Sequence, residues 1–307
     1  MSRTEISQLG EFALIDRLTE AFPLRHESSL KGVGDDAAVI ATPDGMQTLL
    51  TTDLLLEGIH FDLTYTPLKH LGYKAAIGSF SDLYAMNAHP QQLLCSVGVS
   101  QRFAVEDLEE LYAGLRLACE RYGVDLVGGD TSASLTGLCL SITAVGVARP
   151  EEIVYRSGAK PTDLICVSGN LGAAYMGLQL LEREKRVFAG QEGEFDPDFA
   201  QHEYILERQL KPEARQDIIL ALRAEGLRPT AMIDDTDGLA VDADAAGFRA
   251  SPSLQAEWCR GTCLRRSSAG RRRDSPHGRG AGDVYDDGRT ERWRRLRARL
   301  YGASCRA

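Results

Sequence analysis

Aspartates that neighbour glycine, serine or threonine recur at the ends of apolar runs in this chain of 307 residues. Five such clusters occur, at residues 34–37, 51–53, 81–82, 128–131 and 233–238. A single aspartate in such a place is more often a helix cap or a turn residue. Five clusters together indicate something else, because they include the adjacent pairs Asp35-Asp36 and Asp234-Asp235, and paired carboxylates repel each other unless a cation neutralises them. The set therefore favours a site for metal ions and phosphate.

Such a site suits the transfer of a phosphoryl group. Magnesium takes oxygen ligands, and a nucleoside triphosphate needs bound metal ions to offset its charge. The neighbouring glycines let backbone N–H groups approach phosphate oxygens. The sequence contains no GxxxxGK[ST] loop and no protein-kinase signature. Phosphoryl transfer by this chain would therefore use another scaffold.

Two further side chains are candidates for such chemistry. His60 follows Asp53 by seven residues, and Arg156 lies in the stretch Tyr-Arg-Ser-Gly-Ala at the entrance to a second unit. A histidine of this kind is usually an ordinary half-buried side chain, and an isolated arginine is usually a solvated surface charge. An arginine that faces phosphates would instead spread the negative charge of the transition state.

Apolar periodicity predicts an α+β unit that ends near residue 150. Its expected helices lie at 5–22, 67–87 and 105–122, and its expected strands at 37–41, 47–54, 92–99, 124–127 and 137–147. A second unit should follow over 151–240. Its expected strands lie at 163–168 and 232–235, and its expected helices at 171–184, 204–209 and 214–225.

The charge of the chain is unevenly distributed. Hydrophobic residues make up 43% of the sequence, enough for a core, and the net charge is −9. Residues 241–307, however, contain 15 arginines, no lysine and 8 acidic residues, without apolar periodicity. A basic, disordered tail could bind nucleic acid or another anionic partner. The segment lacks the lysines and interleaved aromatic residues of such tails, so an aberrant origin is favoured.

The remaining composition indicates a cytoplasmic, reduced protein. The seven cysteines form no CxxC pair, which argues against a disulfide framework or a zinc site. Residues 1–8 are polar, so no secretory signal is expected, and no apolar run approaches the length of a membrane span. Neither nucleic acid nor a membrane is expected as a partner.

The ordered motifs resemble the thiamine-monophosphate kinase family. They are GVGDDAAV, TTDLLLEGIHF, FSDLYAMNAHP, LVGGDTS, YRSGAKPTDLICVSGNLGAAYMGL and MIDDTDGLA, and the resemblance covers about residues 9–240. This family belongs to a superfamily with aminoimidazole ribonucleotide synthetase, selenophosphate synthetase and a hydrogenase maturation factor. The resemblance implies a two-domain fold, with an ATP- and Mg²⁺-binding α+β domain over 1–150 and the start of an incomplete C-terminal α/β domain over 151–240.

The resemblance also implies a reaction and a set of site residues. ATP and thiamine monophosphate would give ADP and thiamine diphosphate by direct transfer, with Mg²⁺ as cofactor and a homodimer as the assembly. His60 would contact thiamine monophosphate, and Asp35 would lie near the site. The implied metal ligands are Asp36, Thr51, Thr52, Asp53, Asp82, Asp130, Asp234 and Asp237, and the residues facing ATP are Gly129, Asp130, Arg156 and Thr236.

The resemblance stops near residue 240. The family pattern continues with a Ser-Gly turn and a Gly-Gly-Glu-Asp-Tyr-Glu-Leu motif whose glutamate contacts substrate, and neither occurs here. Permitted codons for residues 291–299, read one base later, encode Asn-Gly-Gly-Glu-Asp-Tyr-Glu-Leu, and the same offset at 254–259 gives a possible Ser-Gly turn. We therefore interpret 241–307 as a frameshifted segment, which predicts a tail that is disordered and lacks part of the site.

Two alternatives follow from the same residues. One is another ATP-dependent synthetase of this superfamily. Selenophosphate synthetase would require a reactive cysteine near the N-terminus, whereas the first cysteine here is Cys95, within an expected strand. The other is a non-catalytic protein that binds a nucleotide and Mg²⁺ through residues 1–150, because the substrate side of the site is incomplete.

Overall fold

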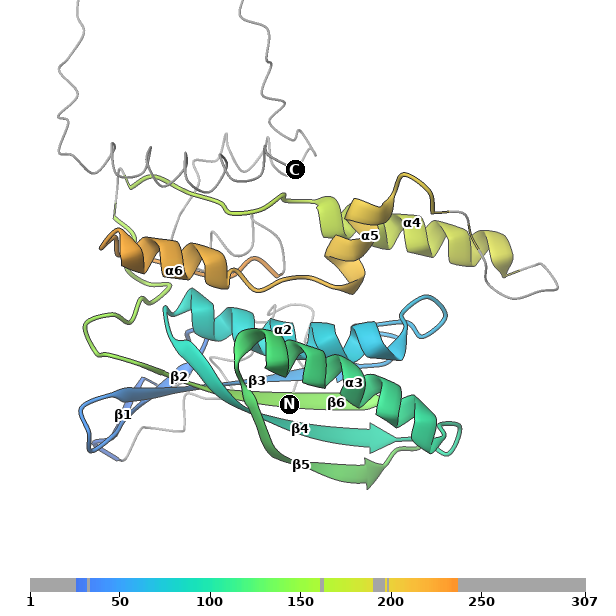
Figure 1. The fold of residues 1–307 in the computed structure, drawn as a ribbon, viewed down its shortest axis with the longest axis horizontal. Helices are drawn as coiled ribbons and strands as arrows, with labels where there is room; N and C mark the ends of the chain where they lie inside the picture. The colour runs from blue at the N-terminus through green and yellow to red at the C-terminus, as the bar shows by residue number, and fades with distance from the viewer. Residues whose placement is uncertain (1–25, 32–33, 161–162, 190–196, 198, 237–307) are drawn as a thin grey trace, which may run out of the picture.

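The computed structural model describes residues 26–31, 34–160, 163–189, 197 and 199–236. The helix expected at 5–22 and the tail at 241–307 lie outside these residues. A six-stranded sheet is the main element of the first part (Figure 1). Its strands are β1 (Ser29–Lys31), β2 (Ala38–Ala41), β3 (Gln47–Leu56), β4 (His89–Val99), β5 (Asp125–Ala133) and β6 (Cys139–Ala148).

The strands are arranged in the order β1-β2-β3-β6-β4-β5. Only β4 and β5 run parallel; the other neighbours are antiparallel. A tight turn joins β2 to β3, where Gly45 has a positive φ of 80°. The α+β class expected from the sequence is therefore confirmed for this part of the chain.

Two long helices cover one face of the sheet (Figure 1). They are α2 (Leu68–Ala85) and α3 (Val105–Tyr122), both close to their expected bounds. Side chains alternate along β3, so Leu49, Thr51 and Asp53 point toward these helices and Thr52 and Leu54 point away. No helix among the described residues covers the other face. The sheet thus carries Asp53 on the packed side, directly under α2.

Direct backbone contact joins the two helices. A Cβ atom at Gly72 of α2 would lie 2.0 Å from the carbonyl oxygen of Leu111, and one at Gly114 of α3 would lie 1.9 Å from the carbonyl oxygen of Lys69. Both distances are impossible for a real Cβ contact, so these two positions require glycine. The contact fixes the distance between α2 and α3, and it therefore fixes the position of Asp82 on α2.

Gly114→Ala should lower the free energy of unfolding, although alanine favours helices. At an exposed helical position the change would stabilise the protein by up to about 1 kcal/mol. Here the new methyl group overpacks the contact with α2, which costs about 1–3 kcal/mol. Urea unfolding measures the difference, with Arg116→Ala on the exposed side of α3 as the control. Equal stability of Gly114→Ala and wild type would contradict the close approach.

The second part contributes helices that pack on the first. They are α4 (Ala173–Phe188), α5 (Glu203–Leu210) and α6 (Gln216–Ala224). Ile219 and Leu222 of α6 belong to the same buried core as the sheet, α2 and α3. Leu181 of α4 and Leu206 of α5 form a separate small cluster. Figure 1 shows the resulting layers, with the sheet first, α2 and α3 above it, and α4 to α6 above those.

Two expectations for the second part are wrong. Residues 163–168 and 232–235 were expected to form strands, but both are irregular segments. A strand needs a neighbour that completes its hydrogen bonds, and within the described ranges neither segment pairs with another strand. Two smaller differences concern the sheet: β5 extends to Ala133 rather than ending near Val127, and β1 lies outside the strands expected from the sequence.

None of the helices in the described residues combines the length and the hydropathy needed to span a membrane.

Candidate active site

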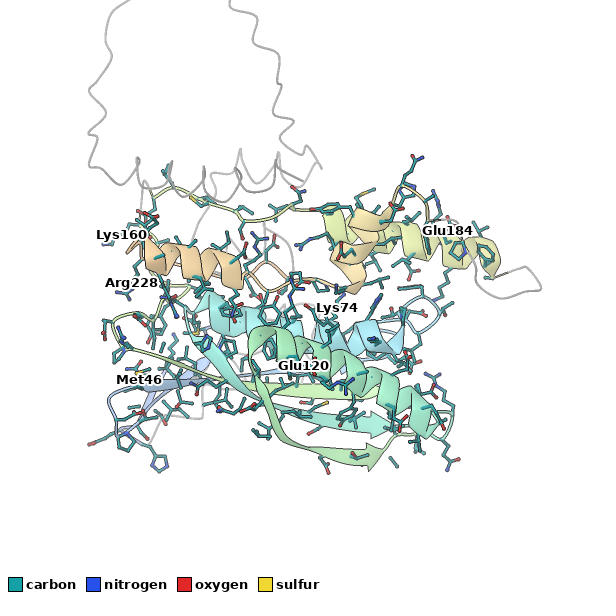
Figure 2. The ribbon with its side chains drawn as sticks, in the orientation of Figure 1. Met46, Lys74, Glu120, Lys160, Glu184 and Arg228 are labelled. Carbon is teal, nitrogen blue, oxygen red and sulfur yellow. The ribbon has the colours of Figure 1, made fainter. Side chains whose placement is uncertain are left out.

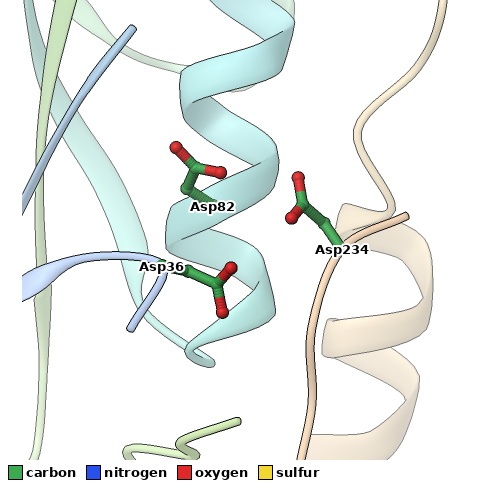
Figure 3. Close-up of side chains that lie close together, drawn as sticks. All are labelled: Asp36, Asp82 and Asp234. Atoms are coloured by element: carbon green, nitrogen blue, oxygen red, sulfur yellow. The ribbon is translucent and has the colours of Figure 1, made fainter. Parts of the chain in front are cut away.

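Three carboxylates from distant parts of the sequence meet beside α2 (Figure 3). Asp36 lies just before β2, Asp82 lies in the last turns of α2, and Asp234 lies in the irregular segment after α6. One carboxylate oxygen of each lies within 4.8 Å of those of the other two. The predicted gathering of aspartates from the first, third and fifth clusters is therefore present in the structure.

Hydroxyl groups hold these carboxylates in place. Thr51 Oγ1 donates a hydrogen bond of 2.6 Å to Asp82 Oδ2. Ser79 Oγ donates one of 2.6 Å to Asp53 Oδ2, which places Asp53 at the edge of the group. Ser79 was not predicted from the sequence. The sequence does carry a sign of it, because Ser79 is a polar residue on the otherwise apolar, buried face of α2. It lies three residues before Asp82, on the same side of the helix.

Arg156 is the cation of the group. Its Nη2 atom donates a hydrogen bond of 2.5 Å to Asp36 Oδ1, and its backbone N–H donates one of 3.3 Å to Asp35 Oδ1. The guanidinium Nε also lies 3.8 Å from Asp35 Oδ1. Arg156 therefore lies beside the carboxylates and is not a solvated surface charge, and its role toward ATP stays a prediction. Asp35 lies nearby through its contact with Arg156.

Burial and mutual repulsion make these carboxylates hard to ionise. Burial, followed by the charges of Asp234 and Asp53, raises the pKa of Asp82 to about 9. Burial also raises the pKa of Asp36 to about 7, although Arg156 opposes the shift. The pKa of Asp234 is raised as well, chiefly by burial, while a hydrogen bond from Ser81 lowers it. The charge of Arg156 opposes these shifts at Asp36 and Asp234 but does not outweigh burial.

The donor set fits a hard divalent cation. Oδ2 of Asp35, Asp36 and Asp234 is buried with no hydrogen-bond partner among the described residues. Magnesium binds oxygen at about 2.1 Å, so two of its ligands lie at most about 4.2 Å apart. The three oxygens lie within 4.8 Å of one another, and this limit is only slightly larger than the 4.2 Å. Small side-chain rotations would therefore let Asp36, Asp82 and Asp234 share one ion.

Binding of Mg²⁺ should strengthen as the pH rises from about 6 to 9. The unfolded chain titrates its aspartates near pH 4, whereas the folded chain holds their protons up to about pH 7 at Asp36 and about pH 9 at Asp82. The folded state thus binds more protons between these limits, so its stability without metal falls as the pH rises. Magnesium must displace these protons and relieves the repulsion that remains.

Thermal unfolding with EDTA or with Mg²⁺, at pH 6 and pH 9, measures this effect. We expect Mg²⁺ to raise the melting temperature more at pH 9 than at pH 6, and calorimetry to detect proton release on binding. The same rise in melting temperature at both pH values would contradict this titration.

The fourth cluster lies elsewhere in the fold. Gly129 and Asp130 lie on β5, and the register runs from Asp53 through Ile142 and Cys95 to Gly129. Three strand spacings, about 14 Å, therefore separate Gly129 from Asp53. A Cβ at Gly129 would lie 1.9 Å from the carbonyl oxygen of Cys95, so packing alone requires glycine there. The structure does not bring Asp130 into the group of three carboxylates.

Three other expected residues also lie outside the group. The Thr52 hydroxyl donates to the carbonyl of Ile142, 3.1 Å away, on the face of β3 opposite Thr51. His60 lies in the loop after β3, where the Leu56 N–H donates a 3.0 Å hydrogen bond to its Nδ1. Thr236 is exposed, two residues after Asp234. Asp237 lies outside the described residues. The roles expected for these residues stay predictions.

The fold and the carboxylate group define a class of proteins. The sequence profile of the family described as "AIR synthase related protein, N-terminal domain" matches residues 34–148, which span β2 to β6 and hold Asp36 and Asp82. This match agrees with the superfamily expected from the motifs.

Individual relatives that align with most of the chain show which family of this class it belongs to. Thiamine-monophosphate kinase of Bacillus subtilis is 31% identical over 232 residues, covering 76% of this chain and 68% of the relative. Thiamine-monophosphate kinase of Aquifex aeolicus is 34% identical over 251 residues, covering 81% of this chain and 74% of the relative. The chain belongs to the thiamine-monophosphate kinase family. This membership disfavours the alternative of another synthetase of the superfamily.

Solved structures agree with this assignment. "AaThiL complexed with AMPPCP and TMP" superposes with a TM-score of 0.68 at 32% identity and covers 81% of this chain and 73% of that chain. Thiamine monophosphate kinase from Aquifex aeolicus superposes with a TM-score of 0.62 at 31% identity, covering 80% and 73%. The α+β fold of the described residues is thus shared with these solved structures, whereas the division into two domains stays a prediction.

Proposed function

We propose that this protein transfers the γ-phosphate of ATP directly to thiamine monophosphate, giving ADP and thiamine diphosphate. The observation that carries the proposal is the buried group of Asp36, Asp82 and Asp234, with Arg156 bonded to its edge. A similar solved structure is described as a complex with AMPPCP, an ATP analogue, and TMP. The reaction would take place in the cytoplasm.

The carboxylates would hold Mg²⁺, which when bound offsets the charge of the phosphates. Asp36, Asp82 and Asp234 would be its ligands, and Asp53 lies beside them. The family resemblance adds Thr51, Thr52, Asp130 and Asp237. The chain's own groups then position the reactants, since phosphoryl transfer needs positioning and charge stabilisation more than covalent catalysis. Arg156 would donate hydrogen bonds to phosphate oxygens and stabilise the charge of the transition state.

An extended nucleotide accounts for the separation between the clusters. Gly129 and Asp130 lie about 14 Å from Asp53, too far to share an ion with it. A bound ATP could reach both places, with its phosphates at the carboxylate group and another part along β5. Thr236, close to Asp234 in sequence, would face the same nucleotide, and His60 would face the acceptor.

Acceptor-dependent release of ADP tests the proposal. The protein is incubated with ATP and Mg²⁺, with and without thiamine monophosphate. We expect ADP release to require both Mg²⁺ and the acceptor. Release that is unaffected by the acceptor would favour the alternative of a nucleotide-binding protein with a weak ATPase activity.

A second copy of the chain would cover the open face of the sheet. Leu54 and Leu56 of β3 are 54% and 37% exposed on that face, where solvated strands usually carry polar residues. Covering this surface with an identical one would bury the apolar side chains of both copies. Light scattering should give about twice the chain mass of 33.5 kDa.

Leu54→Lys should produce a monomer, because the new charge would be buried in the interface. Leu117→Lys, on the exposed side of α3, is the control and should leave the dimer intact. A dimer that survives Leu54→Lys would place the interface on another surface.

A further inference from the structure

Asn87 is a buried polar residue in the turn that ends α2, five residues after Asp82. Its φ of 58° lies in the left-handed region, which asparagine tolerates and glycine adopts without strain. Its backbone N–H donates a 2.9 Å hydrogen bond to the carbonyl oxygen of Tyr84 and so closes the helix. Glycine would form this turn equally well, so the side chain of Asn87 requires an explanation of its own.

The side chain of Asn87 joins two other segments to this turn. Its Nδ2 donates a 2.7 Å hydrogen bond to the carbonyl oxygen of Glu152, and its Oδ1 accepts one of 2.9 Å from Nε of Arg223 on α6. Nη2 of Arg223 also donates to the backbone carbonyl of Asn87, so the guanidinium holds this residue at two points. Removing a buried amide whose donor and acceptor are both bonded is costly, because the groups left behind lose their partners.

Each of the two joined segments leads to the carboxylate group. Glu152 lies four residues before Arg156, and Arg223 lies eleven residues before Asp234. The third segment is α2 itself, which carries the central carboxylate of the group. The side chain of Asn87 therefore contacts the segments that bring Arg156 and Asp234 to this helix.

The two joined segments also hold each other on the way to the site. Nη2 of Arg228 donates a 2.5 Å hydrogen bond to the carbonyl oxygen of Ile153 (Figure 2). Further along, the N–H of Met232 donates a 3.4 Å hydrogen bond to the carbonyl oxygen of Tyr155. A contact that fixes one of these segments against α2 therefore helps to fix the other.

Met86, the neighbour of Asn87, ties the remaining carboxylate to the same turn. The N–H of Ala37, directly after Asp36, lies 3.1 Å from Sδ of Met86. The N–H of Val154 donates a 3.2 Å hydrogen bond to the carbonyl oxygen of Met86. The segments that carry the three carboxylates and Arg156 thus meet at residues 86–87.

We infer that Asn87 is a positioning residue of the metal site, because its side-chain amide holds the segments that carry Arg156 and Asp234 against the end of α2. Asn87 acts through these groups and is not itself a ligand of the metal ion. The inference rests on the proposed function for what the site does, whereas the contacts that carry it lie entirely within this chain.

Asn87→Gly tests this role, because glycine keeps the positive φ and removes both side-chain hydrogen bonds. Titration calorimetry with Mg²⁺ alone should show binding about tenfold weaker than in wild type, as expected when a group that orients metal ligands is lost. The number of sites per chain should stay the same, since unfolded protein would lower that number whereas misplaced ligands lower the affinity. Equal Mg²⁺ affinity of Asn87→Gly and wild type would overturn the inference.

Gln201→Gly is the matched control. Among the described residues, Gln201 is the only other non-glycine residue with a positive φ, 71°, and it is exposed in the loop before α5. The same gain of backbone freedom at this place should leave Mg²⁺ binding as in wild type. If Gln201→Gly weakens binding as much as Asn87→Gly does, the loss comes from glycine itself and the inference is wrong.

Arg223→Gln tests the same contact from α6. It should also weaken Mg²⁺ binding, because it releases the helix that leads to Asp234. Combined with Asn87→Gly, its effect should fall short of the product of the two single effects, since both changes break one contact. Effects that multiply in full would show that the two residues act independently, and would contradict the inference.

Turnover separates this inference from the proposed function. In Asn87→Gly the Mg²⁺ concentration for half-maximal ADP release, at a fixed ATP concentration, should rise about tenfold, with the KM for thiamine monophosphate unchanged. Normal turnover with an unchanged Mg²⁺ dependence would overturn the role of Asn87 and leave the kinase reaction standing. Mg²⁺ binding that depends on Asn87, in a wild-type protein without turnover, would support the positioning and count against the reaction.

Discussion

Replacing Asp82 with asparagine should lower Mg²⁺-dependent ADP release by at least about 100-fold and leave the metal-free protein as stable as wild type. The loss follows from removing one ligand of a preorganised charged site, where single groups contribute about 10²–10³ in rate. The unchanged stability follows from the pKa of Asp82, which burial and neighbouring carboxylates raise to about 9. At pH 7 its carboxyl group is protonated, and an amide of the same shape replaces it.

The function and the stability of this one variant should therefore respond differently. ADP release and calorimetric Mg²⁺ binding should both be lost, while the melting temperature in EDTA should match that of wild type. Asp217→Asn, at an exposed pair with Arg215 on α6, is the control and should change neither. A variant that keeps Mg²⁺-dependent turnover would remove Asp82 from the metal site. A melting temperature in EDTA well above that of wild type would show that Asp82 is ionised before metal binds, because asparagine would then remove a repulsion between carboxylates.

Replacing residues 241–307 with the alternative-frame reading should raise acceptor-dependent ADP release by about 100-fold. The alternative reading restores a Gly-Gly-Glu-Asp-Tyr-Glu-Leu motif, whose glutamate contacts substrate in the family, and one such contact contributes about this factor. The alignments leave about a third of the Bacillus subtilis relative and a quarter of the Aquifex aeolicus relative without a counterpart, at 68% and 74% coverage.

The irregular segment at residues 163–168 supplies a structural reason for the same expectation. Leu164, Ile165 and Val167 are 75%, 53% and 43% exposed, although their sequence is that of a buried strand. Exposed apolar side chains in a contiguous run mark a surface that another element normally covers. Restoring the frame should therefore also lower the fluorescence of a dye that binds exposed apolar surface.

The control for this experiment is the restored chain with Asp82→Asn. It should show the lower dye fluorescence but no ADP release. The restored segment would cover the apolar side chains at residues 163–168, whereas the substitution removes a ligand of the metal site. Equal activity of the original chain and the restored chain would show that residues up to about 240 are sufficient for ADP release. The interpretation of residues 241–307 as frameshifted would then lose its functional support.

The elements of the first part could be predicted because their patterns are local. Helix α3 begins and ends at the expected residues, since its apolar positions repeat at helical spacing and Gly123 ends it with a positive φ of 68°. The carboxylates of the candidate site could be predicted for a different reason. Asp36 and Asp82 stand in short polar interruptions of apolar runs, and their residue types indicate cations whatever the fold.

What remained hidden depends on contacts between distant segments. The sequence could not show that α6 shares the core of the sheet through Ile219, or that Asp130 lies three strands from Asp53. Strand order is set by packing of the whole sheet, and no local pattern encodes it. The pairing of Tyr65 with Glu182, across 117 positions, was hidden for the same reason. Residues 163–168 were misassigned because their apolar pattern describes a strand whose neighbours the described residues do not supply.

The most direct test of the central claim follows the phosphate itself. The protein is incubated with Mg²⁺, thiamine monophosphate and ATP that is radioactively labelled in the γ-phosphate, and the products are separated by chromatography. Direct transfer predicts that the label appears in thiamine diphosphate, in the same amount as the ADP that is released. Label that appears only in inorganic phosphate, with no labelled thiamine diphosphate, would contradict the account.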